Sequence, residues 1–556
     1  MKSGTPTTSS LARSLRRLFR LQWPRRAAIV FCGVVGTLLP AAYGTHAGVR
    51  EPVVHDEFSY LLAADTFAHG RLTNPSPEHP EFFEAPHILV VPSYGSKYPP
   101  GQGLMLALGQ VLCGRPIWGV WLSCGLFAAS LCWMLQAWTS GPWALATTAL
   151  SIATCGVSSY WAQSYWGGMV AACGGALLFG SLRRTLRAPR VGSSILMGAG
   201  VVVLANTRPF EGLLACVAAG VPLTVWLVQN RSVTLSEKLA RWVLPLCGVV
   251  LFGVACMAYY NRAVTGSWLT PPYVVHQNQY FDQGVFRFSS PRPPDRKPVP
   301  RVAAFYTEYK KPPQRGLPLV LGTLESFYRN LAMSIDSSLG MTLETRGSPF
   351  ARLWLLALIA TLSLRDRWVW FCIGTVCLVL LGAAIVWWWF PHYVAPIYSI
   401  EIAVLAVTLR RADANTRRRQ PARRMAPLVV AILAALFIAL PMLNHVILAR
   451  YAPPESDKPT AASAGDASPG DTRTRAQITR QLERQAGRHL VFVRYDPDFT
   501  VHEESVYNGA DLAGSSVIFA HDLGTAKNAQ VIADYPGRTL WIVHVTLKES
   551  RLEHYQ

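Results

Sequence analysis

The stretch IWGVWLSCGLFAASLCWMLQAW at residues 117–138 decides the class of fold. It contains no Asp, Glu, Lys or Arg, and it has the length of roughly 20 apolar residues that an α-helix needs to cross a bilayer. The whole chain agrees, since 51% of its residues are hydrophobic and only 15% are charged. A soluble protein carries nearer a quarter charged residues. The sequence therefore predicts an α-helical membrane protein.

Further apolar blocks lie on both sides of this stretch. The strongest lie at 27–43, 210–228, 242–260, 368–390 and 426–449, and shorter or Gly-rich ones at 143–161, 168–181, 192–205, 349–362 and 395–409. Together they predict a polytopic membrane domain over residues 27–450 with about eleven transmembrane helices. The basic start could also be read as a signal peptide, but the first apolar block is long for one, and we expect that helix to be retained.

The formal charge of +20 is concentrated in short segments between these blocks. The basic clusters lie at 13–26, 183–190, 231–241, 365–367 and 410–424. With eleven helices, all of them fall on the side of the N-terminus, which is the positive-inside pattern of cytoplasmic loops. The charge therefore predicts an N-in, C-out topology in a bilayer with anionic headgroups, and no nucleic-acid partner.

The same topology divides the chain into parts. Residues 1–26 form a basic cytoplasmic tail, and two large loops, 44–115 and 261–347, lie outside. The second loop is rich in Pro and Arg and is expected to be irregular. Residues 451–471 read as a flexible linker, because Pro, Ala, Ser, Gly and Asp dominate them.

The last part, residues 472–556, is expected to be a small soluble α/β domain with an accessory, periplasmic role. It alternates short apolar strands with helical segments. The expected strands are His489–Tyr495, Ser516–Ala520 and Thr539–Val545, and the expected helices are Ile478–Ala486 and Asn528–Asp534. Its acidic residues, Glu503 and Glu504 among them, are expected to be solvated. The eleven cysteines lie in or beside apolar blocks, and none forms a zinc-binding pattern, so no residue is assigned to a metal.

Two candidate motifs follow the first helix. HDEFSY at residues 55–60 puts two adjacent carboxylates, Asp56 and Glu57, at a membrane edge, where one could act as a general base. A solvated helix start with Asp56 as N-cap explains them equally well. SKYPPG at residues 96–101 puts Lys97 beside a rigid turn, where its ammonium could meet a lipid phosphate. An ordinary interfacial lysine is the alternative.

Two more motifs lie later in the chain. NTRPFEG at residues 206–212 places Arg208 and Glu211 between two apolar blocks, where ionisable residues are either paired with one another or functional. WWWFPHY at residues 387–393 ends on His392 and Tyr393; its aromatics fit a membrane-interface belt, while His392 could contact phosphate or sugar. All four motifs fall on the outer face under the topology that the basic clusters predict.

In this order and topology, the four motifs resemble the GT-C superfamily of integral membrane glycosyltransferases. The resemblance covers about residues 27–450 and is closest to bacterial members related to the protein mannosyltransferase and aminoarabinose transferase group. It implies a GT-C-like fold in the bacterial inner membrane, with the active face in the periplasm. It also implies transfer of a sugar from a polyprenyl-phosphate carrier to a cell-envelope acceptor.

The resemblance also implies roles for individual residues. The general base falls on Asp56, or on Glu57 if the register shifts, and Lys97 matches a phosphate-contacting lysine, although Tyr98 departs from the family pattern. Arg208 and His392 are further candidates for binding the donor phosphate. The substrate cavity is assigned to His55, Tyr98, Glu211 and Tyr393. Some members use a divalent metal and others none, so a cofactor stays open.

Two other classes of function remain. A transporter or lipid flippase would place ionisable residues near the bilayer midplane, on broken helices in paired halves of the chain. A non-catalytic envelope-assembly protein would tolerate Asp56→Asn and Lys97→Ala without loss of function. The polar motifs gather at one face, which favours surface chemistry and hence the enzyme.

Overall fold

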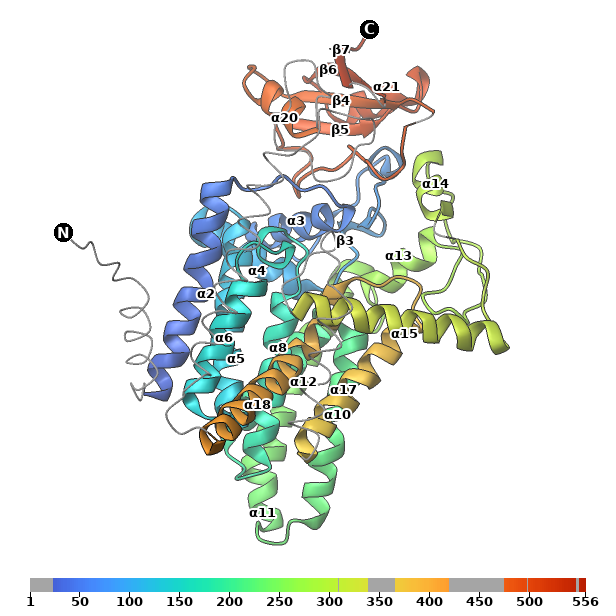
Figure 1. Ribbon diagram of the computed structural model, residues 1–556. Coiled ribbons are helices and arrows are strands. Elements are labelled where there is room, and N and C mark those ends of the chain that lie inside the picture. Colours follow the sequence, from blue (N-terminus) through green and yellow to red (C-terminus); the bar gives the residue numbers. More distant parts are fainter. Residues whose placement is uncertain (1–23, 309, 339–365, 420–474, 498, 547–549) are drawn as a thin grey trace, which may run out of the picture. The chain divides into compact units, whose positions relative to one another are not determined.

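The structure is a computed structural model and describes residues 24–308, 310–338, 366–419, 475–497, 499–546 and 550–556. The expected spans at 349–362 and 426–449, the linker at 451–471 and most of the basic tail lie outside these residues. Figure 1 shows the order of the elements along the chain.

The helices are α2 (Arg25–Ala47), α3 (His55–Ala68), η1 (Pro80–Phe83), α4 (Pro100–Cys113), α5 (Ile117–Trp138), α6 (Gly141–Cys155), α7 (Tyr160–Gln163), α8 (Met169–Thr185), α9 (Val191–Ala205), α10 (Pro209–Gln229), α11 (Leu235–Lys238), η2 (Leu239–Val243), α12 (Leu244–Thr265), α13 (Pro272–Tyr280), α14 (Pro300–Glu308), α15 (Gly316–Ser338), α17 (Arg367–Ala384), η3 (Pro391–Val394), α18 (Ala395–Arg419), α20 (Arg475–Glu483) and α21 (Thr525–Asp534). The strands are β1 (Asn74–Pro75), β2 (Ile88–Leu89), β3 (Ser93–Ser96), β4 (His489–Tyr495), β5 (Val517–His521), β6 (Thr539–Val545) and β7 (Ser550–His554).

These elements form two compact units. The helical unit combines residues 1–49, 117–255 and 315–452, and the second unit combines 50–116, 256–314 and 453–556. We call the second one the loop unit, because it gathers most of the two large interhelical segments and the C-terminal sheet. Three segments far apart in the sequence thus build each unit.

In the helical unit, six described helical segments are long and apolar enough to cross a membrane. Six of the predicted blocks, 117–138 and 395–409 among them, lie wholly or largely on such segments, and the shorter ones at 143–161, 168–181 and 192–205 correspond to α6, α8 and α9. These three helices have only 15, 17 and 15 residues. The chain is a multi-pass membrane protein, while the count of eleven and the orientation stay predictions.

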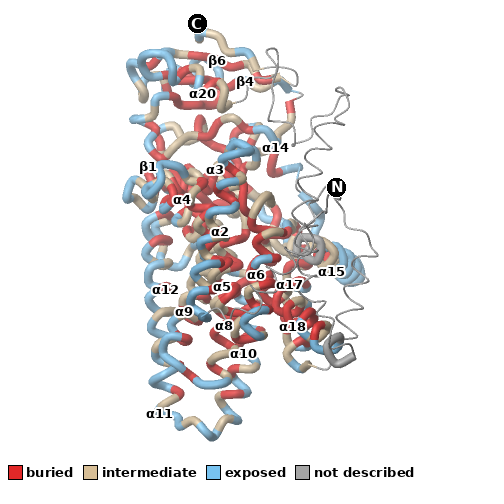
Figure 2. The backbone as a smooth tube through the Cα atoms, turned by 60° about the vertical axis from the view of Figure 1, so that its left-hand side comes forward, coloured by how far each residue is buried: buried red, intermediate tan, exposed pale blue. Residues whose placement is uncertain are grey.

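Helix α5 lies at the centre of this unit and packs against α2 and α8. Of its apolar window 72% is buried, against 33% for the window of α2. Helix α2 exposes Val30, Val34 and Leu38, and its trace carries exposed, pale blue stretches in Figure 2. An exposed apolar face suits contact with lipid tails. Helices α2 and α5 approach closely because small residues meet there: a Cβ on Gly36 would lie 2.7 Å from Ala128 Cβ.

The expectation that residues 261–347 are irregular holds for 281–299, but it is wrong where helices form in the rest of the described segment. Helices α13 and α14 begin at Pro272 and Pro300, in the first turn, where proline costs no hydrogen bond. Helix α15 follows, and it runs across the direction of α10 within the helical unit (Figure 1). Its apolar residues recur at helical spacing, so the prolines of this segment start helices instead of preventing them.

The loop unit contains a small mixed sheet with strand order β5-β4-β6-β7. Strand β4 pairs in parallel with both β5 and β6, and β7 is antiparallel to β6. The predicted strands at 489–495 and 539–545 are confirmed residue for residue, and the third is shifted by one. Both predicted helices are present as α20 and α21. Buried Leu490 and Ile518 belong to one apolar cluster with Phe82 of η1.

A buried ion pair stabilises the loop unit. Arg301 Nε donates to Glu504 Oε2 at 3.1 Å, and Arg301 Nη2 donates to the carbonyl of Thr500 at 2.7 Å. The guanidinium lies 3.5 Å from the centre of the Tyr495 ring. The Glu504 side chain is only 1% exposed, so the expectation of a solvated acid is wrong. Burial alone would raise the pKa of Glu504, but His521, Arg301 and hydrogen bonds together lower it.

Arg301→Ala should destabilise the C-terminal sheet, because it leaves the Glu504 carboxylate buried without its partner. Breaking such a pair costs about 3–5 kcal/mol, so amides of β4 should exchange with deuterium at least about a hundredfold faster. The matched control is Arg551→Ala, since its ion pair with Glu553 is exposed and contributes at most about 1 kcal/mol. Equal exchange in both variants would remove this role from Arg301.

The lowered pKa of Glu504 also gives this stabilisation a pH dependence. A carboxyl group whose pKa is lowered by folding stabilises the protein at pH values above its pKa in the unfolded chain, which is about 4.3 for glutamate. This part of the stability should therefore be complete at neutral pH and be lost as the pH falls through and below that value. The loss in the exchange of β4 amides should be larger in wild type than in Arg301→Ala, where His521 and the hydrogen bonds alone lower the pKa of Glu504.

Candidate functional site

A short hairpin and a helix start bring the first group of candidate residues together in the loop unit. Strands β2 and β3 pair antiparallel, with Ile88 opposite Ser96, so His87 and Lys97 stand opposite each other just beyond the ladder. The N–H of Lys97 donates to the carbonyl of His87 at 3.3 Å. The Ser59 hydroxyl, from α3, donates to the same carbonyl at 2.7 Å. This bond ties α3 to the hairpin.

The two adjacent carboxylates have different environments. Glu57 Oε2 accepts from the N–H groups of Val53 and Val54, at 2.9 and 3.2 Å, and its residue is 5% exposed. It therefore caps α3 by satisfying backbone donors at the start of the helix. Asp56 lies in the first turn of α3 and is not its N-cap, which is Val54. The structure thus separates the two acids, which sequence alone leaves open.

The Asp56 carboxylate is 23% exposed, so it can be reached from outside the protein. The Tyr98 hydroxyl donates a hydrogen bond to Asp56 Oδ1. Asp56 Oδ2 lies 3.8 Å from Nε2 of His87. Tyr98 in turn stacks on Tyr60, with ring centres 4.5 Å apart. The carboxylate is therefore oriented by Tyr98 and His87 and still partly exposed, as a general base requires.

Lys97 is buried, with 6% of its surface exposed. Its Nζ lies 2.7 Å from His87 Nδ1, and it stands 5.0 and 5.3 Å from the ring centres of Tyr98 and Tyr273. Burial lowers the pKa of Lys97 to about 7, although the charge of Asp56 works in the opposite direction. An ammonium that is poorly solvated by its own protein gains more from an arriving phosphate than an exposed lysine would.

His87 was not a candidate from sequence. It lies between the two motifs, in EAPHI at residues 84–88, and nothing in that stretch distinguishes it from an ordinary loop histidine. In the structure it contacts both Asp56 and Lys97. Burial, with the neighbouring charge of Lys97, lowers its pKa well below the ordinary value, so the ring is neutral at pH 7.

Other side chains support this group, which we call the Asp56 cluster: Asp56, His87, Lys97 and Tyr98. The Tyr306 hydroxyl accepts from the N–H of His87 at 3.0 Å and lies 3.1 Å from His276 Nε2. His55 does not join them through a hydrogen bond; its Nδ1 lies 2.7 Å from the Tyr507 hydroxyl. Burial lowers the pKa of His55 to about 4. His55 thus stands among side chains of the loop unit as a neutral, buried group.

The remaining candidates belong to the helical unit. Arg208 precedes α10, and its guanidinium carbon lies 4.4 Å from the centre of the Tyr393 ring. Glu211, in the first turn of α10, is buried. His392, 1% exposed, has Nδ1 3.1 Å from the Tyr160 hydroxyl, and its ring lies 4.8 Å from that of Trp166. The predicted residues therefore form two groups, one in each unit.

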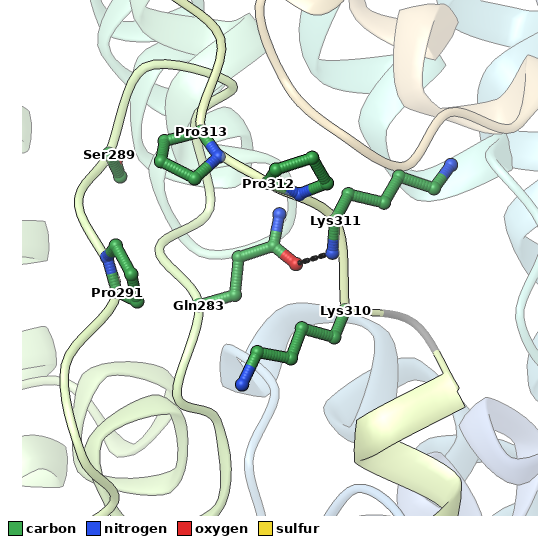
Figure 3. Close-up of a pocket in the computed structure, with 7 residues that line it drawn as sticks. All are labelled: Gln283, Ser289, Pro291, Lys310, Lys311, Pro312 and Pro313. Carbon is green, nitrogen blue, oxygen red and sulfur yellow. Dashed lines mark hydrogen bonds between the residues drawn. The ribbon is translucent and has the colours of Figure 1, made fainter.

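The described residues add no cluster of metal ligands to these groups, and a pocket in the loop unit is lined by other residues. Among the described residues, no three His, Cys, Asp or Glu side chains are arranged to hold a metal ion. A pocket of about 230 Å³ lies in the loop unit between residues 283–291 and 310–313 (Figure 3). Figure 3 shows Gln283 at its centre, accepting a hydrogen bond from the backbone of Lys311. None of the predicted site residues lines it.

No protein-family model and no curated protein matches this sequence. Among solved structures, the chain is similar to ArnT from Cupriavidus metallidurans bound to undecaprenyl phosphate, with 14% identity, 93% of this chain and 92% of that chain covered, and a TM-score of 0.47. For ArnT from the same organism in the apo state, the identity is 13%, 96% of this chain and 93% of that chain are covered, and the TM-score is 0.44. The chain is also similar to the archaeal oligosaccharyltransferase AglB from Archaeoglobus fulgidus in complex with an inhibitory peptide and a dolichol-phosphate. There the identity is 11%, 95% of this chain and 70% of that chain are covered, and the TM-score is 0.38.

The chain is similar to these solved structures over most of its own length. With TM-scores below 0.5, the backbones agree only coarsely. The function proposed below therefore rests on the side chains of this chain.

Proposed function

We propose that this protein is a membrane glycosyltransferase that moves a sugar from a polyprenyl-phosphate carrier to a hydroxyl group of a cell-envelope acceptor. The observation that carries the proposal is the Asp56 cluster. It combines an accessible, oriented carboxylate with a buried cation, and a neutral histidine lies between them. A sugar transfer from a phosphate leaving group needs a base for the acceptor and positive charge for the phosphate.

In the proposed reaction, Asp56 takes the proton of the acceptor hydroxyl as its oxygen attacks the anomeric carbon of the sugar. The bond from that carbon to the phosphate oxygen breaks, and the sugar passes through an oxocarbenium-like state. The electron pair leaves with the phosphate. Lys97 stabilises the charge that develops there, so the leaving group needs no proton donor. Tyr98 keeps Asp56 oriented.

The remaining candidate residues also have proposed roles. Arg208 and His392 are proposed to bind donor phosphate, and Glu211, Tyr393 and His55 to line the substrate cavity. The stacking of Arg208 on Tyr393 fixes its guanidinium, which suits an anion-binding role. The periplasmic face and the bacterial inner membrane follow from the predicted topology and belong to the same proposal. No residue is assigned to a metal.

The experiment that tests the function is sugar transfer, or slow donor hydrolysis, in proteoliposomes. A panel of radiolabelled polyprenyl-phosphate sugars is supplied, with cell-envelope extracts as acceptor. Turnover of one donor by the wild-type protein would support the reaction class and name the sugar. If folded wild type turned over none of them, the transporter, flippase or assembly hypotheses would replace the enzyme.

The affinity for the donor should depend on pH through Lys97. The donor is a phosphodiester and keeps its negative charge over the neutral range, while Lys97 loses its proton above a pKa of about 7. The KM for the donor should therefore be flat below pH 7 and rise by up to about tenfold per pH unit above it. His87 and His276, whose pKa values lie well below 6.5, do not titrate in this range.

The measurement is the KM for the donor between pH 6 and pH 9 at constant ionic strength. Lys97→Met serves as the control, because its KM should be raised and should not change with pH. A wild-type KM that stays level up to pH 9 would contradict phosphate binding by a lysine with this pKa.

A further inference from the structure

His87 lies between Lys97 and Asp56. Its ring presents one nitrogen to each of them: Nδ1 lies 2.7 Å from Lys97 Nζ, and Nε2 lies 3.8 Å from Asp56 Oδ2. The proposed base and the proposed phosphate-binding cation are thus connected through a single imidazole. A neutral imidazole has one donor nitrogen and one acceptor nitrogen, so the two contacts constrain each other.

The backbone of His87 is held as tightly as its ring. Its φ of 68° lies in the left-handed region, which costs a non-glycine residue about 1–3 kcal/mol and is concentrated at functional sites. Three hydrogen bonds hold it there: its N–H donates to the Tyr306 hydroxyl, and its carbonyl accepts from Ser59 and from the N–H of Lys97. Hydrogen bonds therefore hold the backbone of His87, and Lys97 and Asp56 contact its ring.

We propose that His87 is a positioning residue that aligns Asp56 and Lys97 with each other by contacting both through its two ring nitrogens. The inference rests on the proposed function, because it assigns His87 a role in that reaction. His87 itself is not proposed to touch the sugar or to carry a proton through the reaction.

The charge of Lys97 determines which nitrogen of His87 carries the proton. A protonated Lys97 has donors only, so it donates to Nδ1, and the proton of the ring then sits on Nε2. This N–H faces Asp56 Oδ2. When a phosphate keeps Lys97 protonated, His87 is therefore kept in the tautomer that orients the base.

The two halves of this role can be separated with two amide substitutions. The amide of Asn reaches about as far as Nδ1 of histidine, and the amide of Gln about as far as Nε2. His87→Asn therefore keeps a partner for Lys97 and loses the one for Asp56, while His87→Gln does the reverse. Asn also tolerates the left-handed backbone better than most residues do.

For His87→Asn we expect kcat to fall about 10- to 100-fold, with the KM for the donor and the affinity for polyprenyl phosphate within about twofold of wild type. For His87→Gln we expect KM and the dissociation constant for polyprenyl phosphate to rise about 10- to 100-fold, with a smaller loss of kcat. His79→Gln, at a surface histidine paired with Asp534, is the matched control and should leave both unchanged.

Binding of polyprenyl phosphate is measured directly, without turnover, so the inference and the proposed function can fail separately. Wild-type turnover together with equal losses of kcat and KM in both variants would overturn the role of His87 and leave the function intact. So would two variants that both match wild type. If no donor is turned over, the function fails; equal lipid binding by wild type and His87→Gln would then overturn the inference as well.

Discussion

Asp56→Asn should bind the donor and fold normally, yet transfer sugar roughly 10²- to 10⁴-fold more slowly than wild type, the range that a general base contributes. The amide is nearly isosteric with the carboxylate, so the hydrogen bond from Tyr98 to Oδ1 can persist. It has no lone pair basic enough to accept the proton of the acceptor hydroxyl. The loss should therefore appear in kcat, with the KM for the donor almost unchanged.

Glu57→Gln is the matched control for this variant, because it makes the same change one residue further along. Glu57 caps α3 through the N–H groups of Val53 and Val54. We expect turnover within a few-fold of wild type, with a loss of stability of about 1 kcal/mol, as for a weakened cap. If Glu57→Gln lost the larger share of kcat, the base would be Glu57, and the assignment to Asp56 would be wrong.

The membrane helices and the C-terminal strands could be predicted because local patterns determine them. A block such as 117–138 is too apolar for water at any position, and an apolar strand such as 539–545 has one favourable partner, the rest of its sheet. The helices α13 to α15 were missed for the opposite reason. Their prolines and arginines suggest a loop by composition, and only the positions of Pro272 and Pro300 at helix starts reverse that.

Some residues of the candidate site could be predicted from local sequence, and others could not. Motifs with unusual chemistry, such as the adjacent acids and Lys97, stand out in the sequence. Their partners do not. His87 is ten residues from Lys97 but looks like an ordinary loop histidine, and Tyr306, which accepts from its N–H, is 219 residues away and meets it only through folding. Burial is equally invisible to a single sequence, which is why Glu504 was expected in solvent and Lys97 could not be distinguished from an interfacial lysine. Long-range packing supplies this information.

Lys97→Met should reduce kcat/KM for the donor about 10²- to 10³-fold, because the developing phosphate charge loses its cation. The variant should also be at least as stable as wild type near pH 7. Burial lowers the pKa of Lys97 from 10.5 to about 7, so between these values the unfolded chain binds more protons at this residue than the folded protein does. The charged form is therefore disfavoured by folding, and Met removes that cost.

The change in activity and the change in stability together distinguish a functional lysine from a structural one. A structural Lys97 would lose activity and stability together, whereas a cation kept for phosphate binding loses activity while stability holds or rises. The measurements are donor kinetics in proteoliposomes and thermal unfolding in detergent at pH 7. Lys310→Met, at an exposed lysine paired with Asp282, is the control and should change neither by much. Unfolding of Lys97→Met at a clearly lower temperature would show that the buried ammonium stabilises the fold, and the phosphate-binding role would lose its physical basis.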